Sequence, residues 1–534
     1  MTESIKVNSD FNIEDLLVIG VDFGTTEFRY SGAAWATFED FKADIINLIL
    51  SWPGHGREEG KAPTAIYYDD GIGETSWGYD ISDDVSAMQW FKLLVLRPDD
   101  VPVDVRQSSA FMNAKRMLKD SGKSAVDVIA DYLRVFWKHV MDTIVRERGE
   151  FVVDALKIHV VLTVPAIWKG YARQRMKKAA LQAGILTPRE AGPTTLSFAP
   201  EPEAAALATL CEPGRSIAKD DVYILCDAGG GTVDLVIYKI ANTNPIQLYE
   251  VGIGTGGLCG GIFLDEAFRD IVKDRLGRVW NNLSRKGENE IMNKEWEEGI
   301  KSKFNTDNRN REYIVSIPAE AVGKSGLNDH SRRPIIKDGR IHFSSSDINK
   351  AFTGVFSSIE GLIDDQVGQA RKANLSVTSA RSLSLGNHTG GGLGTNSYLH
   401  QHLRSSRTAI SRGAVFKGFI DGPQANTMDA RSTNVPPSIS VISSVARESI
   451  GVVVRKPFIN GVHRREDRMW NHITGEHMAD HQMRWLVKKI PGTNKWGKRA
   501  QYDIKMVLSG ATVEFSASYG GKLMKSEDVS IEYA

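Results

Sequence analysis

Two β-hairpins are predicted by apolar runs that lie on either side of short polar turns. In the first, the apolar run 16–21 is followed by the turn D-F-G-T-T and then by the apolar run 33–38. In the second, the runs 222–226 and 233–237 flank the turn 227–232, which has the sequence D-A-G-G-G-T. Continuous apolar runs beside glycine-containing turns are typical of buried hairpin strands. The pattern therefore places two similar turns far apart in one chain.

The residues of both turns suit the binding of a phosphate group together with a metal ion. Glycine has no Cβ, so the backbone N–H groups of a glycine turn can approach an anion closely. Threonine hydroxyls can donate to phosphate oxygens, and carboxylate oxygens are ligands for Mg²⁺. Taken alone, either turn could equally be an ordinary hairpin with an aspartate as turn former. The candidate residues are Asp22, Gly24, Thr25 and Thr26 in the first turn and Asp227, Gly229, Gly230, Gly231, Thr232 and Asp234 in the second.

The composition is that of an ordinary globular protein and argues against several classes of partner. A chain of 534 residues exceeds what one core usually holds, so several domains are expected. Lys+Arg and Asp+Glu are equal at 66 each, so no overall field attracts nucleic acid or an acidic membrane. The three cysteines lack the spacing of a disulfide framework or zinc site, which favours a reducing compartment. We expect a cytoplasmic or nucleocytoplasmic protein without a signal peptide or membrane segment.

Helical and strand-like patterns alternate over most of the chain. The longest helical pattern lies over 121–149, where apolar residues recur at helical spacing after Ser124, a residue type that often caps helices. We expect further helices over 171–183, 264–271, 294–304 and 347–370, and strands over 61–68, 313–317 and 340–344.

The C-terminal part has a different pattern. Residues 421–438 are rich in Pro, Ser, Asn and Thr and are predicted to form a linker. Residues 439–534 alternate apolar and polar positions, which predicts a small antiparallel β-domain. Basic residues and tryptophans gather over 455–499, but a solvated face of the β-domain is the favoured interpretation, and no nucleic-acid partner is expected. The P-loop-like match at 492–498 is rejected because Arg499 replaces the metal-binding hydroxyl.

Further motifs follow one another along the chain between and after the two turns. The sequence T-V-P-A at 163–166 is followed by a basic helix and by E-P-E-A-A-A, which begins at Glu201. After the second glycine turn come G-G-L-C-G-G at 256–261 and G-G-G-L-G-T-N-S-Y-L at 390–399. Each motif is weak alone, whereas their order is specific. In this order they resemble the seventy-kilodalton heat-shock (DnaK-like) chaperones of the actin-like ATPase superfamily.

The resemblance implies an α/β fold in which two ribonuclease-H-like lobes face each other across a nucleotide cleft. Lobe I would comprise residues 15–212, completed by 404–420, and lobe II would comprise 213–403. The linker and the β-rich domain 439–534 would follow. The implied ligands are ATP or ADP with Mg²⁺.

The resemblance also implies roles for the matching residues. Asp22 and Asp234 would hold magnesium through water, while Asp227 and Glu201 would orient or deprotonate the attacking water. Lys92 would lie beside the γ-phosphate, and the glycines and threonines of both turns, Thr232 among them, would hold the phosphates. The other nucleotide contacts would come from Gly260, Gly261, Glu298, Lys301, Gly391, Gly392 and Gly394.

Some of these residues have simpler interpretations. Glu201 could be an acidic residue favoured by the dipole at a helix N-terminus. Lys92 could be a surface lysine whose stem lies along apolar neighbours. Glu298 and Lys301 could form a surface pair at i,i+3 spacing.

Several positions depart from the pattern of the chaperones. Glu27 stands where they usually have an aromatic residue, and Ile262 and Phe263 stand where they carry an acidic pair. Residues 379–389 interrupt the passage to the last glycine loop, as an insertion or a gene-model error. The acidic-leucine linker and the long helical lid of the family are absent. The chain therefore resembles the divergent, lidless heat-shock-like ATPases.

The expected function is ATP binding with weak ATPase activity and a chaperone-like role. A client polypeptide or partner protein would bind the C-terminal β-domain, and the oligomeric state is not predicted. One alternative is a regulatory scaffold that binds nucleotide without hydrolysing it. A further alternative is a small-molecule kinase on the actin-like fold.

Overall fold

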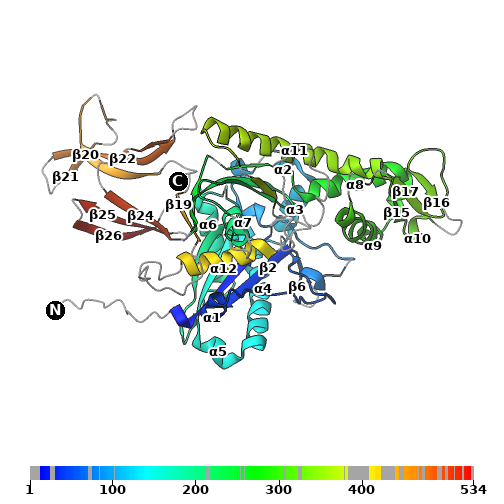
Figure 1. The fold of residues 1–534 in the computed structure, drawn as a ribbon, viewed down its shortest axis with the longest axis horizontal. Coiled ribbons are helices and arrows are strands. Elements are labelled where there is room, and N and C mark those ends of the chain that lie inside the picture. Colours follow the sequence, from blue (N-terminus) through cyan, green and yellow to red (C-terminus); the bar gives the residue numbers. More distant parts are fainter. Residues whose placement is uncertain are drawn as a thin grey trace. The chain divides into compact units, whose positions relative to one another are not determined.

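The computed structural model forms two compact units, Met1–Ser443 and Ser444–Ala534, and Figure 1 colours their elements along the chain. No helix among the described residues is long and apolar enough to cross a membrane. The structure describes residues 13–24, 30–69, 75–82, 84–101, 103–166, 168–210, 217–243, 246–252, 254–257, 259–304, 308, 310–322, 327–377, 379–382, 408–421, 439–443, 450–460, 462–463, 465, 468–471, 476–489, 496–498, 503–509, 512–519 and 522–530.

The first sheet contains the first predicted hairpin at its centre. Strand β1 (Leu16–Asp22) is antiparallel to β2 (Tyr30–Thr37) and parallel to β7 (Lys157–Val164), which is parallel to β10 (Thr195–Pro200). Every residue of β1 is buried, which explains its uninterrupted apolar run. The order across the sheet is β10-β7-β1-β2-β3, and β4 also pairs with β2. The short strands at this side are β3 (Asn47–Leu48) and β4 (Ala62–Pro63).

The second sheet repeats this arrangement around the second hairpin. Strand β11 (Val222–Ala228) is antiparallel to β12 (Val233–Thr243) and parallel to β18 (Ser379–Ser382). On its other side, β12 pairs with β13 and β14, and β13 is parallel to β19, which gives the order β18-β11-β12-β13-β19. Both sheets thus have a central hairpin with a parallel strand beside its first strand. The remaining strands are β13 (Ile246–Glu250), β14 (Thr255–Gly257) and β19 (Ile439–Ser443).

Two helices, α7 (Glu201–Leu210) and α12 (Ala409–Asp421), contribute to a core that includes residues of both sheets. Helix α7 contacts β7 and β10 of the first sheet and β11 and β12 of the second, whereas α12 contacts β1, β2 and β7. The two helices approach so closely that a Cβ on Gly413 would lie 1.6 Å from the carbonyl oxygen of Ala204. Only glycine fits at this crossing, and the alanine-rich sequence of α7 suits the same close approach.

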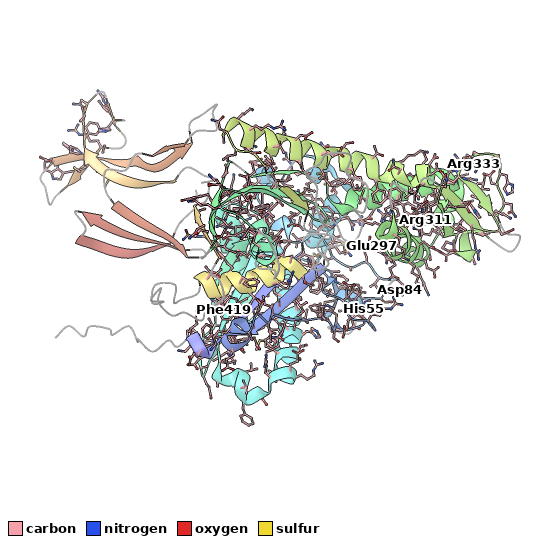
Figure 2. The ribbon with its side chains drawn as sticks, viewed as in Figure 1. His55, Asp84, Glu297, Arg311, Arg333 and Phe419 are labelled. Atoms are coloured by element: carbon pink, nitrogen blue, oxygen red, sulfur yellow. The ribbon has the colours of Figure 1, made fainter. Side chains whose placement is uncertain are left out.

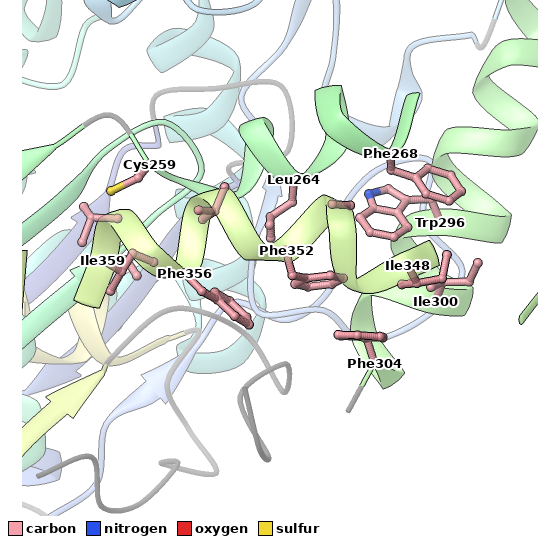
Figure 3. Close-up of a cluster of buried hydrophobic side chains, with 14 of the residues drawn as sticks. Cys259, Leu264, Phe268, Trp296, Ile300, Phe304, Ile348, Phe352, Phe356 and Ile359 are labelled. Carbon is pink, nitrogen blue, oxygen red and sulfur yellow. The ribbon is translucent and has the colours of Figure 1, made fainter. Parts of the chain in front are cut away.

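Amphipathic helices cover the sheets, as their apolar spacing predicts. Helix α4 (Ala125–Arg148) begins after Ser124, whose hydroxyl caps it as expected, and packs on α6 (Gly170–Gln182). Helices α8 (Gly261–Leu276) and α11 (Ser345–Lys372) contribute to a second core (Figure 3). In that core the rings of Phe268 and Trp296 stack with centroids 4.1 Å apart, and those of Phe304 and Phe352 stack at 4.4 Å.

The segment predicted as a helix over 294–304 differs from an ordinary α-helix. It is a π-helix, η6 (Glu290–Ile300), followed by a 3₁₀ turn, η7 (Lys301–Lys303). π-Helices are rare and occur often at functional sites. Likewise, the predicted strand 61–68 consists of two pieces, β4 and β5, because Thr64 and Ala65 interrupt the pairing.

The other elements of the first unit are short helices and small sheets. Strands β15 and β17 match the predictions over 313–317 and 340–344. The elements are η1 (Ile13–Asp15), α1 (Phe38–Lys42), β5 (Ile66–Tyr68), β6 (Thr75–Trp77), η2 (Gly78–Asp80), η3 (Leu93–Val95), η4 (Pro98–Asp100), α2 (Val103–Gln107), α3 (Ser109–Asp120), α5 (Glu150–Ala155), β8 (Pro188–Arg189), β9 (Gly192–Pro193), η5 (Gly277–Asn282), α9 (Arg285–Asn289), β15 (Glu312–Ser316), α10 (Ala319–Val322), β16 (Ile335–Lys337) and β17 (Arg340–Ser344).

The second unit is antiparallel β-structure, as the alternating pattern predicts. One sheet has the order β20-β22-β21, with β23 also paired to β22, and the other has the order β24-β25-β26. The predicted β-domain starts at 439, whereas strand β19, over 439–443, belongs to the second sheet of the first unit. The strands are β20 (Ile450–Pro457), β21 (Arg468–Asn471), β22 (Glu476–Lys489), β23 (Trp496–Lys498), β24 (Asp503–Ser509), β25 (Thr512–Tyr519) and β26 (Lys522–Ser530).

Candidate functional site

Strand alternation turns the aspartates of both hairpins toward the core that the two sheets share. Successive residues of a strand point to opposite faces of the sheet. Val18 of β1 lies in the shared core, so Asp22, four residues later, points to the same side. Leu225 of β11 also lies in that core, so Asp227 points there too. The two hairpins therefore direct their carboxylates to the same region of the first unit.

The second hairpin places two buried carboxylates opposite each other. Asp227 of β11 and Asp234 of β12 are directly paired in the antiparallel register. Directly opposed side chains in such a pair have Cβ atoms about 4.5–5.5 Å apart and lie on one face. Asp227 is 1% exposed and Asp234 is 2% exposed. The hydroxyl of Thr232 donates to Asp234 Oδ2 at 3.3 Å. This is a compact set of oxygen atoms of the kind that binds a hard divalent cation.

The glycine turn between these strands is held by the N-terminus of α8. The amides of Gly261 and Ile262 donate to the carbonyl oxygens of Gly229 and Gly230, each at 2.8 Å, and the amide of Gly260 donates to Gly231 at 3.3 Å. A Cβ on Gly260 would lie 2.4 Å from the first two of these oxygens. Glycine at 260 is therefore a steric requirement for docking the turn on the helix. The nucleotide contacts predicted for Gly260 and Gly261 stay a prediction.

Lys92 connects the first hairpin to helix α7. Its side chain is fully buried, and Nζ lies 2.9 Å from Glu201 Oε1 at the start of α7. The same ammonium also donates to the carbonyl oxygen of Phe23, directly after Asp22. The interpretation of Lys92 as a snorkelling surface lysine is therefore wrong. Glu201 is 1% exposed, so it is a buried partner in a charge pair as well as the first residue of a helix.

Lys61 is a residue of the site that the sequence interpretation did not single out. Its ammonium lies 2.5 Å from Asp22 Oδ2, and the side chain is 16% exposed. Nearby, the amide of Gly24 donates to Ser31 Oγ at 3.2 Å, and that hydroxyl lies 2.9 Å from Thr64 Oγ1. The only signal in the sequence was a lysine at the start of the K-A-P-T segment. The two hairpins thus differ: a lysine faces the aspartate of the first, and a second aspartate faces that of the second.

Lys301 lies in a buried cluster behind the N-terminus of α8. Its ammonium lies 2.8 Å from Asp265 Oδ1 of α8 and 2.7 Å from Glu297 Oε2. Glu297 belongs to η6 and is labelled in Figure 2. The indole N–H of Trp296 donates to the same Asp265 oxygen at 2.6 Å. Burial raises the pKa of the Asp265 carboxyl to about 7, although the Lys301 ammonium acts to lower it. Burial acts to lower the pKa of Lys301, but Asp265 and Glu297 together raise it above its usual value.

This geometry changes the interpretation of the predicted Glu298–Lys301 pair. Lys301 is 4% exposed, so the interpretation of Lys301 as half of a surface pair at i,i+3 spacing is wrong. Its ammonium pairs with the carboxylates of Glu297, one turn away on η6, and of Asp265 on α8; Glu298 is exposed. The ammonium lies 3.6 Å from the position of a Cβ on Gly261, which places it beneath the first residue of α8.

Five predicted contacts lie outside the described residues. They are Thr25 and Thr26 of the first turn and Gly391, Gly392 and Gly394 of the last glycine loop. Of the segment 379–389, residues 379–382 form strand β18 beside β11. The start of the predicted insertion is therefore part of the second sheet.

Comparison with known proteins agrees with the resemblance of the motifs. Heat shock 70 kDa protein 12A of Homo sapiens is 25% identical over 340 residues, which are 51% of this chain and 48% of that protein. Heat shock 70 kDa protein 12B of Homo sapiens is 26% identical over 321 residues, which are 48% of this chain and 44% of that protein. A chaperone protein HscA homolog of Pseudomonas putida is 27% identical over 276 residues, which are 49% of this chain and 38% of that protein.

The curated relatives of this chain are heat-shock-70 proteins. The predicted resemblance to this family is confirmed, and the identities are those of a divergent heat-shock-70-like protein. No family model matches the chain. The chain spans about half the length of the curated heat-shock-70 relatives that it matches, or less. The mixed α/β architecture is consistent with the fold that the resemblance implies.

Proposed function

We propose that this heat-shock-70-like chain binds ATP with Mg²⁺ between two ribonuclease-H-like lobes and hydrolyses it slowly. The observation that carries this proposal is the pair of buried carboxylates, Asp227 and Asp234, on the face of the second hairpin that also receives α7. Two like charges at directly opposed positions are unfavourable alone. A Mg²⁺ ion that arrives with the nucleotide would offset this repulsion between the two carboxylates.

The residues present fit a magnesium nucleotide. The oxygen atoms offered to the metal are those of Asp22 in the first hairpin and of Asp234 and Thr232 in the second, and oxygen is the ligand that Mg²⁺ takes. Since the described residues bring no three carboxylates together at one point, Asp22 and Asp234 would hold the ion through water. When bound, the metal would neutralise charge on the phosphates. The first hairpin would contribute Asp22, which Lys61 holds in place at 2.5 Å. The glycine turn would contribute backbone amides other than that of Gly229, which donates to the Thr232 carbonyl oxygen at 2.9 Å.

The buried Lys92–Glu201 pair would position the water that attacks the phosphate. Glu201 begins α7 and is held by the Lys92 ammonium at 2.9 Å, so its carboxylate has little freedom to turn. A carboxylate within hydrogen-bond reach of water can orient it or accept its proton, and Asp227 would share this role. The same ammonium is well placed to stabilise negative charge that develops on phosphate oxygens.

The wider role rests on the relatives. These relatives are named as heat-shock and chaperone proteins, and we propose a client polypeptide or partner protein for the C-terminal β-rich unit. A cytoplasmic or nucleocytoplasmic location is part of the same proposal. A small-molecule kinase is disfavoured because the Glu201 motif belongs to the chaperone-like pattern.

Replacement of Asp227 tests the proposed chemistry. Asp227→Asn keeps the size of the side chain but removes its charge, so phosphate release should fall about 100-fold or more while ATP affinity changes little. The control is Asp84→Asn, which alters an exposed aspartate outside the site and should leave turnover unchanged. Turnover of the Asp227→Asn protein equal to the wild type would contradict the assignment. Nucleotide binding without metal-dependent turnover in the wild type would instead support the regulatory scaffold.

A further inference from the structure

Ile262 lies between the core of the second sheet and an apolar cluster formed by residues 90–114, a segment far from it in the sequence. It is the second residue of α8, and its amide holds the glycine turn through the Gly230 carbonyl oxygen. Leu264 and Phe268 face the core of the second sheet, with 0% exposure. Residues two apart on a helix point in nearly opposite directions, so the side chain of Ile262 leaves that core. It is nonetheless only 3% exposed.

The side chain of Ile262 joins an apolar cluster formed by residues 90–114, which we call the Ile262 cluster. Phe263 packs against the same cluster and is partly buried. An isoleucine and a phenylalanine in the first turn of a helix are unusual, because acidic residues are favoured there by the helix dipole. No acidic residue lies in the first turn of α8. The buried members of the Ile262 cluster are Trp90, Leu93, Val101, Val105, Phe111, Ala114 and Ile262.

The segment that forms this cluster also carries Lys92. Phe91 and Lys92 face the first hairpin: the rings of Phe91 and Phe23 have centroids 6.3 Å apart, and Lys92 binds the Phe23 carbonyl oxygen. Trp90 and Leu93, on either side of them, lie in the Ile262 cluster. Within these four consecutive residues, Phe91 and Lys92 therefore contact the first hairpin, while Trp90 and Leu93 belong to the cluster that Ile262 of α8 joins.

The backbone at Trp90 indicates that this placement is enforced by its surroundings. Trp90 has a φ of 62°, in the left-handed region, and is 3% exposed. A bulky residue adopts this conformation only when the neighbouring structure imposes it, and such strain gathers at functional sites. Its indole N–H has no hydrogen-bond partner among the described residues. Trp90 therefore packs through its apolar ring in the Ile262 cluster.

We infer that Trp90 and Ile262 are positioning residues that hold the Lys92–Glu201 pair and the glycine turn of the second hairpin in one fixed arrangement. The consequence is that bound nucleotide leaves slowly, because the phosphate-binding turn cannot move away from Lys92 without exposing the Ile262 cluster to water. The effect on nucleotide release rests on the proposed function. The packing of Trp90 and Ile262 in one cluster, and the protection it gives the Ile262 amide, are independent of the proposed function.

Two measurements on the full chain test the inference, with a matched control. Ile262→Ala and Trp90→Ala should speed the release of a fluorescent ATP analogue with magnesium about tenfold or more. Ile348→Ala removes an equally buried isoleucine from the first turns of α11, outside the Ile262 cluster (Figure 3). It should lower thermal stability similarly but leave release within about twofold. Trp90→Phe keeps the apolar ring without the N–H and should retain slow release. Ile262→Val, a smaller change, covers the case in which the alanine variants do not fold.

Hydrogen–deuterium exchange without nucleotide separates this inference from the proposed function. In Trp90→Ala, a peptide that contains the Ile262 amide should exchange about tenfold faster, while peptides from the core of α11 should not change. Unchanged exchange at Ile262, or equal release from Ile262→Ala and Ile348→Ala, would overturn the inference. A wild-type protein that binds no ATP analogue would overturn the proposed function, and the exchange result would still decide whether Trp90 controls the amide of Ile262.

Discussion

The two hairpins have the same strand arrangement but different electrostatics. Each begins with a fully buried strand that ends at or beside an aspartate, Asp22 in β1 and Asp227 in β11. In the first hairpin the aspartate faces Lys61 at 2.5 Å, whereas in the second Asp227 faces Asp234 across the strand pair. The same topology therefore carries one carboxylate with a lysine and one pair of carboxylates. The first hairpin is suited to fix a charge in place, and the second is suited to receive a cation.

The hairpins are also supported differently. The turn of the second is bound through its carbonyl oxygens to the amides of Gly260, Gly261 and Ile262. In the first hairpin, the Lys92 ammonium instead donates to the carbonyl oxygen of Phe23, the residue after Asp22, and also to Glu201. Backbone support tolerates few changes at the glycines, while side-chain support depends on a single buried ion pair.

The largest expected effect comes from breaking the support of the first hairpin. Lys92→Met leaves Glu201 charged and buried without its ammonium partner, which should destabilise the protein by about 3–5 kcal/mol. Thermal unfolding and ATP turnover should both show the loss. The double variant Lys92→Met with Glu201→Gln should recover stability but not turnover. Lys61→Met is the matched control: its lysine is partly exposed, so its removal should cost far less. Equal destabilisation by the two lysine variants would contradict the distinction.

A smaller effect is expected from breaking the support of the second hairpin. In Gly260→Ala the new Cβ would lie 2.4 Å from two carbonyl oxygens of the turn, so the turn must shift. Overpacking of this kind typically costs about 1–3 kcal/mol, and we expect nucleotide affinity to fall by about 10-fold or more. The neighbouring variant Gly261→Ala is the steric comparison: the nearest atom to its Cβ is 3.6 Å away, an ordinary contact, so the turn can stay in place. Calorimetric titration of both variants with ATP and magnesium measures the two affinities. Similar affinities would contradict the prediction, because they would mean that the turn tolerates the shift.

The smallest effect concerns the cluster behind the second hairpin and depends on pH. Burial raises the pKa of Asp265 from 3.8 to about 7 in the folded protein. Because the folded protein holds this proton more tightly than the unfolded chain, the protonated carboxyl stabilises the fold. This contribution is complete below the pKa of the unfolded chain and is lost as the pH rises through the folded pKa of about 7. Between pH 5 and pH 8 the wild type should therefore lose about 1 kcal/mol or more relative to Asp265→Asn, which cannot titrate. Melting temperatures of the two proteins that stay parallel over this range would exclude the raised pKa.

Much of the fold could be predicted from apolar periodicity, because the central strands and long helices are buried on definite faces. β1, β11, α4, α6 and α11 follow the predicted runs closely, whereas β12 begins as predicted at 233 but continues to Thr243, beyond the predicted end at 237. The carboxylates of the site were predicted from the same turns. The π-helix η6 was not, since its residues have ordinary helical spacing.

The contacts between segments far apart in the chain could not be predicted from the sequence. Lys92 had the same local pattern as a surface lysine, and only the approach of Glu201 and Phe23 shows that it is buried. Lys61 had no pattern of its own. In the sequence, Ile262 and Phe263 only depart from the acidic pair of the chaperones. Their packing against residues 90–114 explains why apolar side chains stand at these two positions. Each of these contacts depends on how separate segments pack together.

The most direct test of the central claim is a calorimetric titration of the wild-type protein with ATP, with magnesium and then with a chelator in its place. The paired carboxylates Asp227 and Asp234 predict a single class of site whose affinity falls clearly when the metal is removed, because their charges then repel the phosphates. No binding of ATP in the presence of magnesium, or an affinity that does not depend on the metal, would contradict the account.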